Sequence, residues 1–127
     1  MRLLLDTNAL LWWLSGSPQL GSRTRAEVGD PANDVCVSAV TGAEIAIKKA
    51  IGKLTAPDDV AERIAADGFI ELPLTLRHGL EVSSLPMHHR DPFDRMLVAQ
   101  ARCEGLVLVT SDRALLDYDV RILPAPL

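Results

Sequence analysis

Short, wholly apolar runs alternate along the chain with longer segments in which apolar residues recur at helical spacing. The apolar runs predict buried strands at residues 3–5, 35–37, 69–72, 106–109 and 120–123. Between them we expect helices at residues 9–14, 23–28, 39–51, 57–66, 75–83 and 92–104, with a short one after residue 112. Apolar strands that alternate with helices are typical of a parallel sheet covered on both faces. The predicted fold class is therefore α/β, a three-layer α/β/α sandwich with a mostly parallel central sheet.

The ends of the predicted helices carry residues with capping chemistry. Asn8 is positioned to cap the helix after the first strand, and Ser38 the long helical segment after the second. Asp91 precedes Pro92, and Gly105 follows the same segment, in the usual order of a cap acid, an early proline and a terminal glycine. Polar residues are thus concentrated at strand ends and helix starts.

The length of 127 residues fits one domain that spans residues 1–127. Cys36 and Cys103 lack metal-ligand spacing, which predicts reduced thiols in a cytoplasmic protein. The apolar N-terminal segment is interrupted by Asp6 and Asn8 and has no small-residue cleavage site. This pattern argues against an export signal and against a membrane span.

The chain is acidic, with 13 basic and 17 acidic residues and a net charge of −4. Proteins that bind nucleic acids usually carry an excess of basic residues. The objection weakens if several acids sit together and bind divalent cations, because two such ions would cancel the whole excess. Net charge alone therefore decides nothing about function.

Two acids follow predicted strands. Asp6 ends the first apolar run and Asp112 comes shortly after residues 106–109. In an open α/β sheet, ligands gather outside the carboxyl ends of the strands. We therefore expect both carboxylates at that edge, although Asp6 can equally begin a turn and Asp112 can cap the next helix.

A third acid, Asp94, lies in the helix that Asp91 opens. At about 100° per residue, Leu97, Val98 and Ala101 form one apolar stripe, and Asp94 projects near its middle. A carboxylate on the core-facing side is costly unless something compensates its charge. The alternative is that Asp94 is the third-position partner of the Asp91 cap.

A fourth acid, Glu44, lies in the helix predicted after Ser38. Glu44 is expected on the margin of the inward face, beside Ile51, while Ile45 is predicted to face outward. A solvated flank position explains Glu44 equally well. The residues predicted to form the inward stripe are Ala43, Ala46, Ile47, Ala50 and Leu54.

These acids come from two strand ends and two helix faces that can converge. Several carboxylates within a few ångströms cannot all ionise near neutral pH without a counter-charge. A divalent cation supplies it, and an all-oxygen site suits Mg²⁺ or Mn²⁺ better than zinc. Such a site activates water and stabilises charge on a phosphate, so the implied chemistry is phosphodiester hydrolysis.

Four segments of the sequence resemble the PIN domain of VapC-type toxins. They are LLLDTNALLWWL, SAVTGAEIAIKKAIGKL, HHRDPFDRMLVAQA and LVLVTSD, in the family's order and across nearly the whole chain. The family's acidic positions fall on Asp6, Glu44, Asp94 and Asp112. The resemblance implies that Asp6 and Asp94 are direct metal ligands, with Glu44 and Asp112 completing the site.

The resemblance also implies a function and partners. A VapC-type protein is expected to be an Mg²⁺-dependent endoribonuclease, with Mn²⁺ as a possible substitute, and the toxin of a type II toxin–antitoxin pair. Its expected partners are an RNA substrate, a cognate antitoxin that inhibits it, and a second copy in a homodimer.

Other polar residues have a functional and a structural interpretation. Asn8 and Ser111 are suited to hydrogen-bond a ligated carboxylate or water, or to serve as turn and capping residues. Arg95 is either a phosphate contact or a surface charge. A phosphate-binding rim or a solvated helix face explains the basic residues Lys48, Lys49, Lys53, Arg90 and Arg102.

His88 and His89 precede a helix without an evident third ligand, so positioning or plain solvation is favoured over metal binding. Trp12 and Trp13 lie about 100° apart on a helix, so both cannot easily face the core. One of the two tryptophans, and Ile45, are candidates for a partner contact.

Three rival functions remain to be weighed. A phosphatase of the haloacid dehalogenase type needs a second acid where this chain has Asn8, and a lysine late in the chain. A phospho-receiver domain needs the late lysine too, and the last lysine here is Lys53. A non-catalytic RNA-binding or protein-interaction module on the same fold is the remaining alternative, against which the four acids argue.

Overall fold

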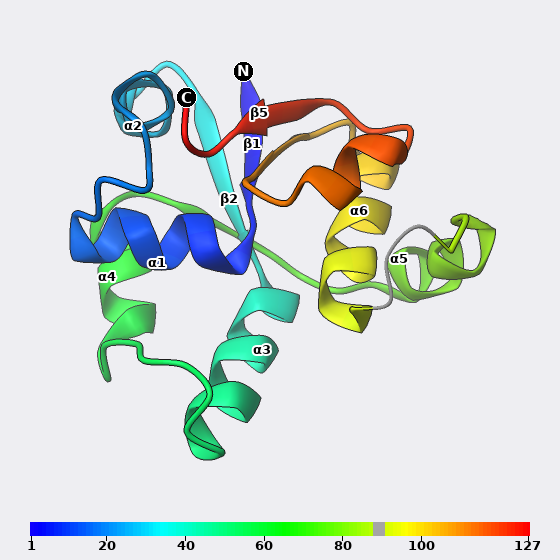
Figure 1. The fold of residues 1–127 in the computed structure, drawn as a ribbon, viewed down its shortest axis with the longest axis horizontal. Helices are drawn as coiled ribbons and strands as arrows, with labels where there is room; N and C mark the ends of the chain where they lie inside the picture. The colour runs from blue at the N-terminus through cyan, green and yellow to red at the C-terminus, as the bar shows by residue number, and fades with distance from the viewer. Residues whose placement is uncertain (88–90) are drawn as a thin grey trace.

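The centre of the molecule is one five-stranded sheet in the order β3-β2-β1-β4-β5, and every neighbouring pair is parallel (Figure 1). This computed structural model describes residues 1–87 and 91–127. The parallel sheet confirms the predicted α/β class. The strands are β1 (Arg2–Leu5), β2 (Asp34–Ser38), β3 (Ile70–Leu72), β4 (Val107–Thr110) and β5 (Ile122–Pro124).

Helices cover both faces of this sheet, as the alternation of side chains along β1 shows. Leu3 and Leu5 belong to one apolar cluster, and Leu4 belongs to a second cluster on the opposite face. The α-helices are α1 (Thr7–Ser15), α2 (Ser22–Gly29), α3 (Ala39–Ala50), α4 (Val60–Ala66), α5 (Leu76–Glu81) and α6 (Pro92–Glu104). Two short 3₁₀ helices, η1 (Val82–Ser84) and η2 (Arg113–Asp117), complete the chain. Residues of α1, α2 and α4 pack in the first cluster and those of α6 in the second, which gives the three predicted layers.

Several predicted boundaries were wrong. Asn8 does not cap the first helix; Asp6 does, because its extended backbone leads directly from β1 and its Oδ1 accepts from the Ala9 amide at 2.8 Å. The fourth helix begins at Val60 and not at residue 57, since a turn at residues 58–59 precedes it. The segment predicted as one helix at residues 75–83 divides into α5 and η1, and the last strand lies two residues later than predicted.

The caps of the two helices nearest the strand ends were predicted correctly. Ser38 accepts from the Val40 amide at 2.9 Å at the start of α3. Asp91 accepts from the amides of Phe93 and Asp94, and Gly105 ends α6 in the left-handed conformation with φ of 65°.

The orientation of α3 differs from the prediction. Ile45, predicted to face outward, is 7% exposed and packs in the first cluster, whereas Ile47 is 52% exposed. Ala43, Ala46 and Ala50 are exposed as well. Helix α3 continues past the carboxyl end of β2 (Figure 1), so most of its length has no sheet beneath it. Its inner face is formed instead by residues turned towards α1 and α6.

None of the helices within residues 1–87 and 91–127 has the length and apolar character needed to cross a membrane. Both cysteines are free thiols: Cys36 is buried in the sheet and Cys103 is half-buried on α6. Three residues discussed above, His88, His89 and Arg90, lie outside the described residues.

Candidate functional site

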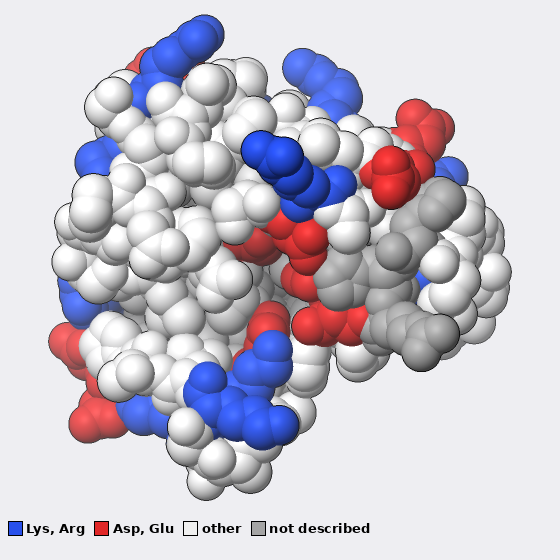
Figure 2. Space-filling model, in the orientation of Figure 1, with Lys and Arg blue, Asp and Glu red and all other residues white. Residues whose placement is uncertain are grey.

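The carboxyl ends of the central strands border a cavity of about 180 Å³. Figure 2 shows acidic side chains gathered in a hollow in the middle of this face, with basic side chains beside it. The acids predicted from the sequence all line this cavity, although they are far apart in the chain. The lining residues are Asp6, Thr7, Asn8, Glu44, Lys48, Lys53, Leu54, Asp91, Asp94 and Asp112.

Asp6 lines the site at the point where β1 passes into α1. Its side chain is buried, and its carboxylate accepts the backbone hydrogen bond from Ala9. Burial raises the pKa of Asp6 from 3.8 to about 6, and the negative charges of Glu44 and Asp112 act in the same direction, against hydrogen bonds from Thr110 and Ala9. The folded protein therefore holds this carboxylate at an electrostatic cost that a nearby cation would relieve.

Glu44 enters the site from the inner face of α3 and is also buried. Its Oε1 accepts from the Thr7 hydroxyl at 2.5 Å, and its Oε2 accepts from the Lys48 ammonium at 2.5 Å. The Thr7 hydroxyl also lies 3.3 Å from that of Thr41, one turn earlier on α3. Both oxygens of Glu44 are thus held in defined directions by α1 and α3.

Lys48 lies four residues after Glu44, so the two side chains share one face of α3. Its Nζ is 3.9 Å from Asp91 Oδ2 and 5.6 Å from the centre of the Phe93 ring. The hydrogen bond to Glu44, with the charges of Glu44, Asp91 and Asp94, raises the pKa of Lys48 against a smaller opposing effect of burial. Lys48 is therefore a cation directed into the acidic cavity.

Asp94 and Asp112 reach the cavity from the other side of β1. Asp94 lies in the first turn of α6, where the positive end of the helix dipole favours a carboxylate. Asp112 follows β4 and caps η2, accepting from the Ala114 amide at 3.0 Å. The capping interpretation of Asp112 is therefore correct. Asp6, which was predicted only to begin a turn, is a cap as well, and both residues line the cavity.

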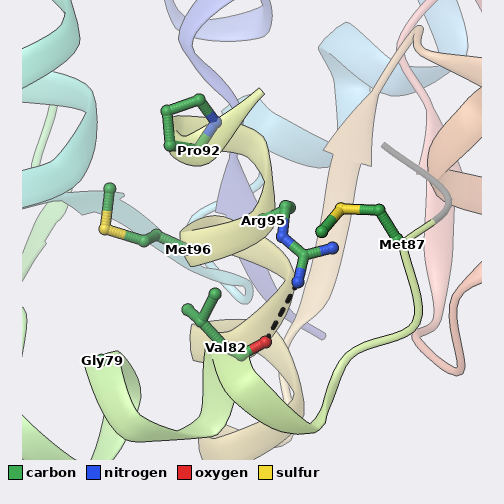
Figure 3. A pocket seen from close by; sticks show the side chains of 6 residues that line it. All are labelled: Gly79, Val82, Met87, Pro92, Arg95 and Met96. Atoms are coloured by element: carbon green, nitrogen blue, oxygen red, sulfur yellow. Dashed lines mark hydrogen bonds between the residues drawn. The ribbon is translucent and has the colours of Figure 1, made fainter. Parts of the chain in front are cut away.

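The other polar residues that the sequence suggested, Asn8, Ser111 and Arg95, occupy different places. Asn8 is exposed and lines the cavity, whereas Ser111 is exposed and is not among the lining residues. Arg95 is 8% exposed and its guanidinium points away, to the carbonyls of Val82, Leu85 and Pro86 and to the Tyr118 hydroxyl. It lines a separate cavity together with Val82 (Figure 3). Arg95 therefore connects the segment after α5 to helix α6 by hydrogen bonds.

The predicted basic rim is only partly assembled. Lys48 and Lys53 line the cavity, whereas Lys49 pairs with Asp58 at 2.5 Å. Arg102 lies near the far end of α6, 3.8 Å from Glu81.

Both tryptophans of α1 are half-buried against the first cluster. The indole of Trp13 donates to Asp67 at 2.9 Å and packs on Phe69, with ring centres 5.7 Å apart. These contacts tie α1 to the segment after α4. Trp12 lines a cavity beside Lys53 and Leu54.

The chemistry of the lining fits a hard divalent cation. Counted over the described residues, it offers five carboxylates against two ammonium groups, a formal excess of three negative charges. Carboxylate oxygens are the ligands that Mg²⁺ and Mn²⁺ prefer. Within the described ranges, no group of three or more such side chains already forms a compact metal-binding cluster. The carboxylates that could bind a metal are present, and the Lys48 ammonium donates a hydrogen bond to one of their oxygens, Glu44 Oε2.

Sequence reasoning missed two contributors to this site. Thr7 was not considered, although it lies between Asp6 and Asn8 in the first segment. Lys48 was weighed only as a rim residue, whereas the Glu44–Lys48 spacing of four residues is a recognisable signal for a helical ion pair.

Comparisons with known proteins identify relatives of this chain. A family model described as PIN domain matches residues 3–121. Ribonuclease VapC22 of Mycobacterium tuberculosis is 32% identical over 119 residues, which cover 88% of each chain. Among solved structures, VapBC2 from Rickettsia felis bound to a promoter DNA fragment has a TM-score of 0.71 at 14% identity, covering 97% of this chain and 98% of that one. DNA-bound VapBC from Salmonella typhimurium has a TM-score of 0.68 at 20% identity and 97% coverage of both chains.

Proposed function

This chain belongs to the PIN-domain family, and from that premise we propose that it is a metal-dependent endoribonuclease that hydrolyses phosphodiester bonds in RNA. One observation supports the proposal above all others. Asp6, Glu44, Asp94 and Asp112 come from four separate parts of the chain and line one cavity at the carboxyl edge of the sheet.

The proposed cofactor is Mg²⁺, with Mn²⁺ as a substitute. Asp6 and Asp94 are the proposed direct ligands, with Glu44 and Asp112 completing the site. When bound, such a cation supplies a water of lowered pKa and stabilises the negative charge that develops on the phosphate. The formal charge excess of the lining and the raised pKa of Asp6 support this assignment.

The protein's own residues prepare the site by fixing its carboxylates before substrate arrives. The Ala9 amide orients Asp6, and the Thr7 hydroxyl orients Glu44. Asp94 is carried by the first turn of α6, a 13-residue helix whose buried face packs in the second cluster. Groups held in this way lose little freedom when the reacting geometry forms. Lys53, at the edge of the cavity, supplies positive charge for the RNA backbone.

The test is cleavage of a structured RNA by the purified protein with Mg²⁺ and with EDTA. We expect cleavage that requires the metal and is lost in Asp6→Asn and Asp94→Asn. Asp59→Asn, which neutralises an exposed acid outside the cavity, is the matched control and should cleave normally. Cleavage that persists in both cavity variants would contradict the assignment, and RNA retention without cutting would favour a binding module.

We further propose that the chain is the toxin of a type II toxin–antitoxin pair, acts in the cytoplasm and forms a homodimer. The similar Rickettsia and Salmonella structures are VapBC assemblies, and a similar Klebsiella pneumoniae structure, with a TM-score of 0.66, is a toxin–antitoxin complex.

Expression of the wild-type chain should arrest bacterial growth, whereas Asp94→Asn should not. Co-expression of a small protein encoded beside the gene should restore growth and bind the purified chain. Light scattering should give twice the mass of the 13.8 kDa chain. Arrest by Asp94→Asn as strong as by wild type would separate toxicity from the proposed nuclease site.

A further inference from the structure

Lys48 holds a position in the acidic cavity that an ordinary surface lysine does not have. Its side chain is 31% exposed, and its ammonium lies 2.5 Å from Glu44 Oε2. The neighbouring Lys49 is on the same helix and also has an acidic partner, but that partner, Asp58, is fully exposed and outside the cavity. The two lysines therefore form a natural pair for comparison, with the same charge and different surroundings.

The contact with Glu44 places Lys48 in competition with any cation that uses the same carboxylate. Glu44 Oε1 accepts from the Thr7 hydroxyl, and Oε2 accepts from the Lys48 ammonium. A cation that binds through Oε2 must therefore displace the ammonium. Two positive groups cannot both approach Oε2 closely, because their mutual repulsion in a half-buried site is poorly screened.

A second set of favourable contacts for the Lys48 ammonium lies nearby. Asp91 Oδ2 is 3.9 Å from Nζ, and the face of Phe93 is 5.6 Å away. A carboxylate and an aromatic ring both attract a lysine ammonium. Lys48 can therefore leave Glu44 by turning towards the start of α6 without losing all of its favourable contacts.

From these contacts we infer that Lys48 is a built-in counter-ion of the cavity, which pairs with Glu44 in the metal-free protein and is displaced towards Asp91 and Phe93 when a divalent cation binds. This inference rests on the proposed metal-dependent function. Lys48 is a positioning residue in this scheme: it keeps the acids together in the metal-free state and weakens the site's affinity for metal.

The inference is tested by the affinity for Mn²⁺, measured by isothermal titration calorimetry at one pH and ionic strength. Binding to the wild type must break the Lys48–Glu44 contact, whereas binding to Lys48→Met does not. We expect Lys48→Met to bind Mn²⁺ about three- to tenfold more tightly than the wild type. Lys49→Met removes the same charge from the neighbouring position and should bind within about twofold of the wild type.

A second measurement uses only the wild-type protein and covers the case in which Lys48→Met folds poorly. The rates at which an amine-reactive acylating reagent modifies Lys48 and Lys49 are compared by mass spectrometry, with and without Mg²⁺. Displacement from Glu44 should raise the Lys48 rate several-fold and leave the Lys49 rate unchanged. An unchanged or lower Lys48 rate would overturn the inference.

The outcomes separate the two proposals. If all three proteins bind Mn²⁺ and Lys48→Met binds no more tightly than Lys49→Met, the counter-ion role is wrong while the metal site stands. If none of them binds Mn²⁺, both the metal-dependent function and the role of Lys48 are wrong.

Discussion

Two polar clusters lie against α6, and they differ in charge. At the start of the helix the acidic cavity combines five carboxylates with two lysines. Further along, Gln100 accepts from the Ser38 hydroxyl at 2.5 Å and donates to the Pro73 carbonyl at 3.2 Å. Ser38 links the second cluster to the β2–α3 junction, whereas Glu44 and Lys48 line the cavity from within α3, and both clusters include buried groups.

The second cluster is closed by its own hydrogen bonds. His78 Nδ1 accepts from the Thr75 amide at 3.0 Å, which leaves the ring proton on Nε2, 2.8 Å from Glu104 Oε1. Across the described part of the chain, every buried side-chain nitrogen or oxygen has a hydrogen-bond partner. Such a network contributes to stability and specificity and has no need of a ligand.

The acidic cavity differs from the second cluster in its balance of charges. Its carboxylates have partners too, but among the described residues of the lining the carboxylates outnumber the lysines by five to two. The comparison teaches that hydrogen-bond satisfaction and charge balance are separate properties. The hydrogen-bonded cluster of Gln100 and His78 is expected to govern stability, and the acidic cavity to govern function.

The largest expected effect separates the two clusters by activity. Asp94→Asn should lower RNA cleavage by roughly a hundredfold or more, because a proposed metal ligand becomes neutral. Its unfolding midpoint in urea without metal should change little, since the loss of one like charge in the cavity offsets the loss of a favourable interaction with the α6 dipole. A variant that lost activity only because it had unfolded would remove the distinction between the clusters.

The next effect concerns the stability of the metal-free protein against pH. The pKa of Asp6 is about 6 in the folded protein and 3.8 in its ordinary state, so folding favours the protonated form. The stability associated with protonated Asp6 is present at low pH and is lost as the pH rises through 6.

The Asp6→Asn variant lacks this titration. Relative to the variant, the wild type should lose about 2.4 kcal/mol of unfolding free energy between pH 4 and pH 7. Urea unfolding at several pH values without divalent ions measures the difference, and Mg²⁺ at pH 7 should reduce it. Parallel stability curves for the two proteins would show that Asp6 is not destabilised by its surroundings.

A smaller effect is expected in the hydrogen-bonded cluster of Gln100 and His78. Gln100→Met leaves the Ser38 hydroxyl and the Pro73 carbonyl without this partner, which should cost about 2 kcal/mol of unfolding free energy. Cleavage per folded molecule should stay within a few-fold of the wild type. If fully folded Gln100→Met lost as much activity as Asp94→Asn, the hydrogen-bond network would act on the site directly.

The smallest effect is the thermal response to metal. At about ten times its dissociation constant, Mg²⁺ should stabilise the wild type by about 1.4 kcal/mol, seen as a higher melting temperature. Asp94→Asn should show a reduced shift, and Gln100→Met a normal one. A shift that Gln100→Met abolishes and Asp94→Asn preserves would reverse the proposed roles.

Most of the architecture was predictable because it depends on local pattern. Apolar runs without polar alternation require strands buried on both faces, and helices between them require a parallel sheet. Asp91, Pro92 and Gly105 defined the ends of α6 correctly, since capping acts within a few residues. The parallel direction of the strands follows from this pattern, since parallel connections need the intervening helices, whereas the strand order was not predicted.

The carboxyl-edge rule located Asp6 and Asp112, and helical spacing drew attention to Glu44 and Asp94. The rule works because the ends of parallel strands lie at one edge whatever the detail of the packing. All four acids line the cavity at that edge.

Sequence periodicity by itself determined which residues share a face of each helix, and the tertiary structure decided which face turns inward. On α3 the stripe with more apolar residues is exposed, and the stripe with Glu44, Ile45 and Lys48 faces the molecule, because the helix extends beyond the sheet and packs by its inner edge. Arg95 likewise turned out to be buried. Spacing is a property of one helix, whereas orientation depends on the free energy of packing against elements that are distant in sequence.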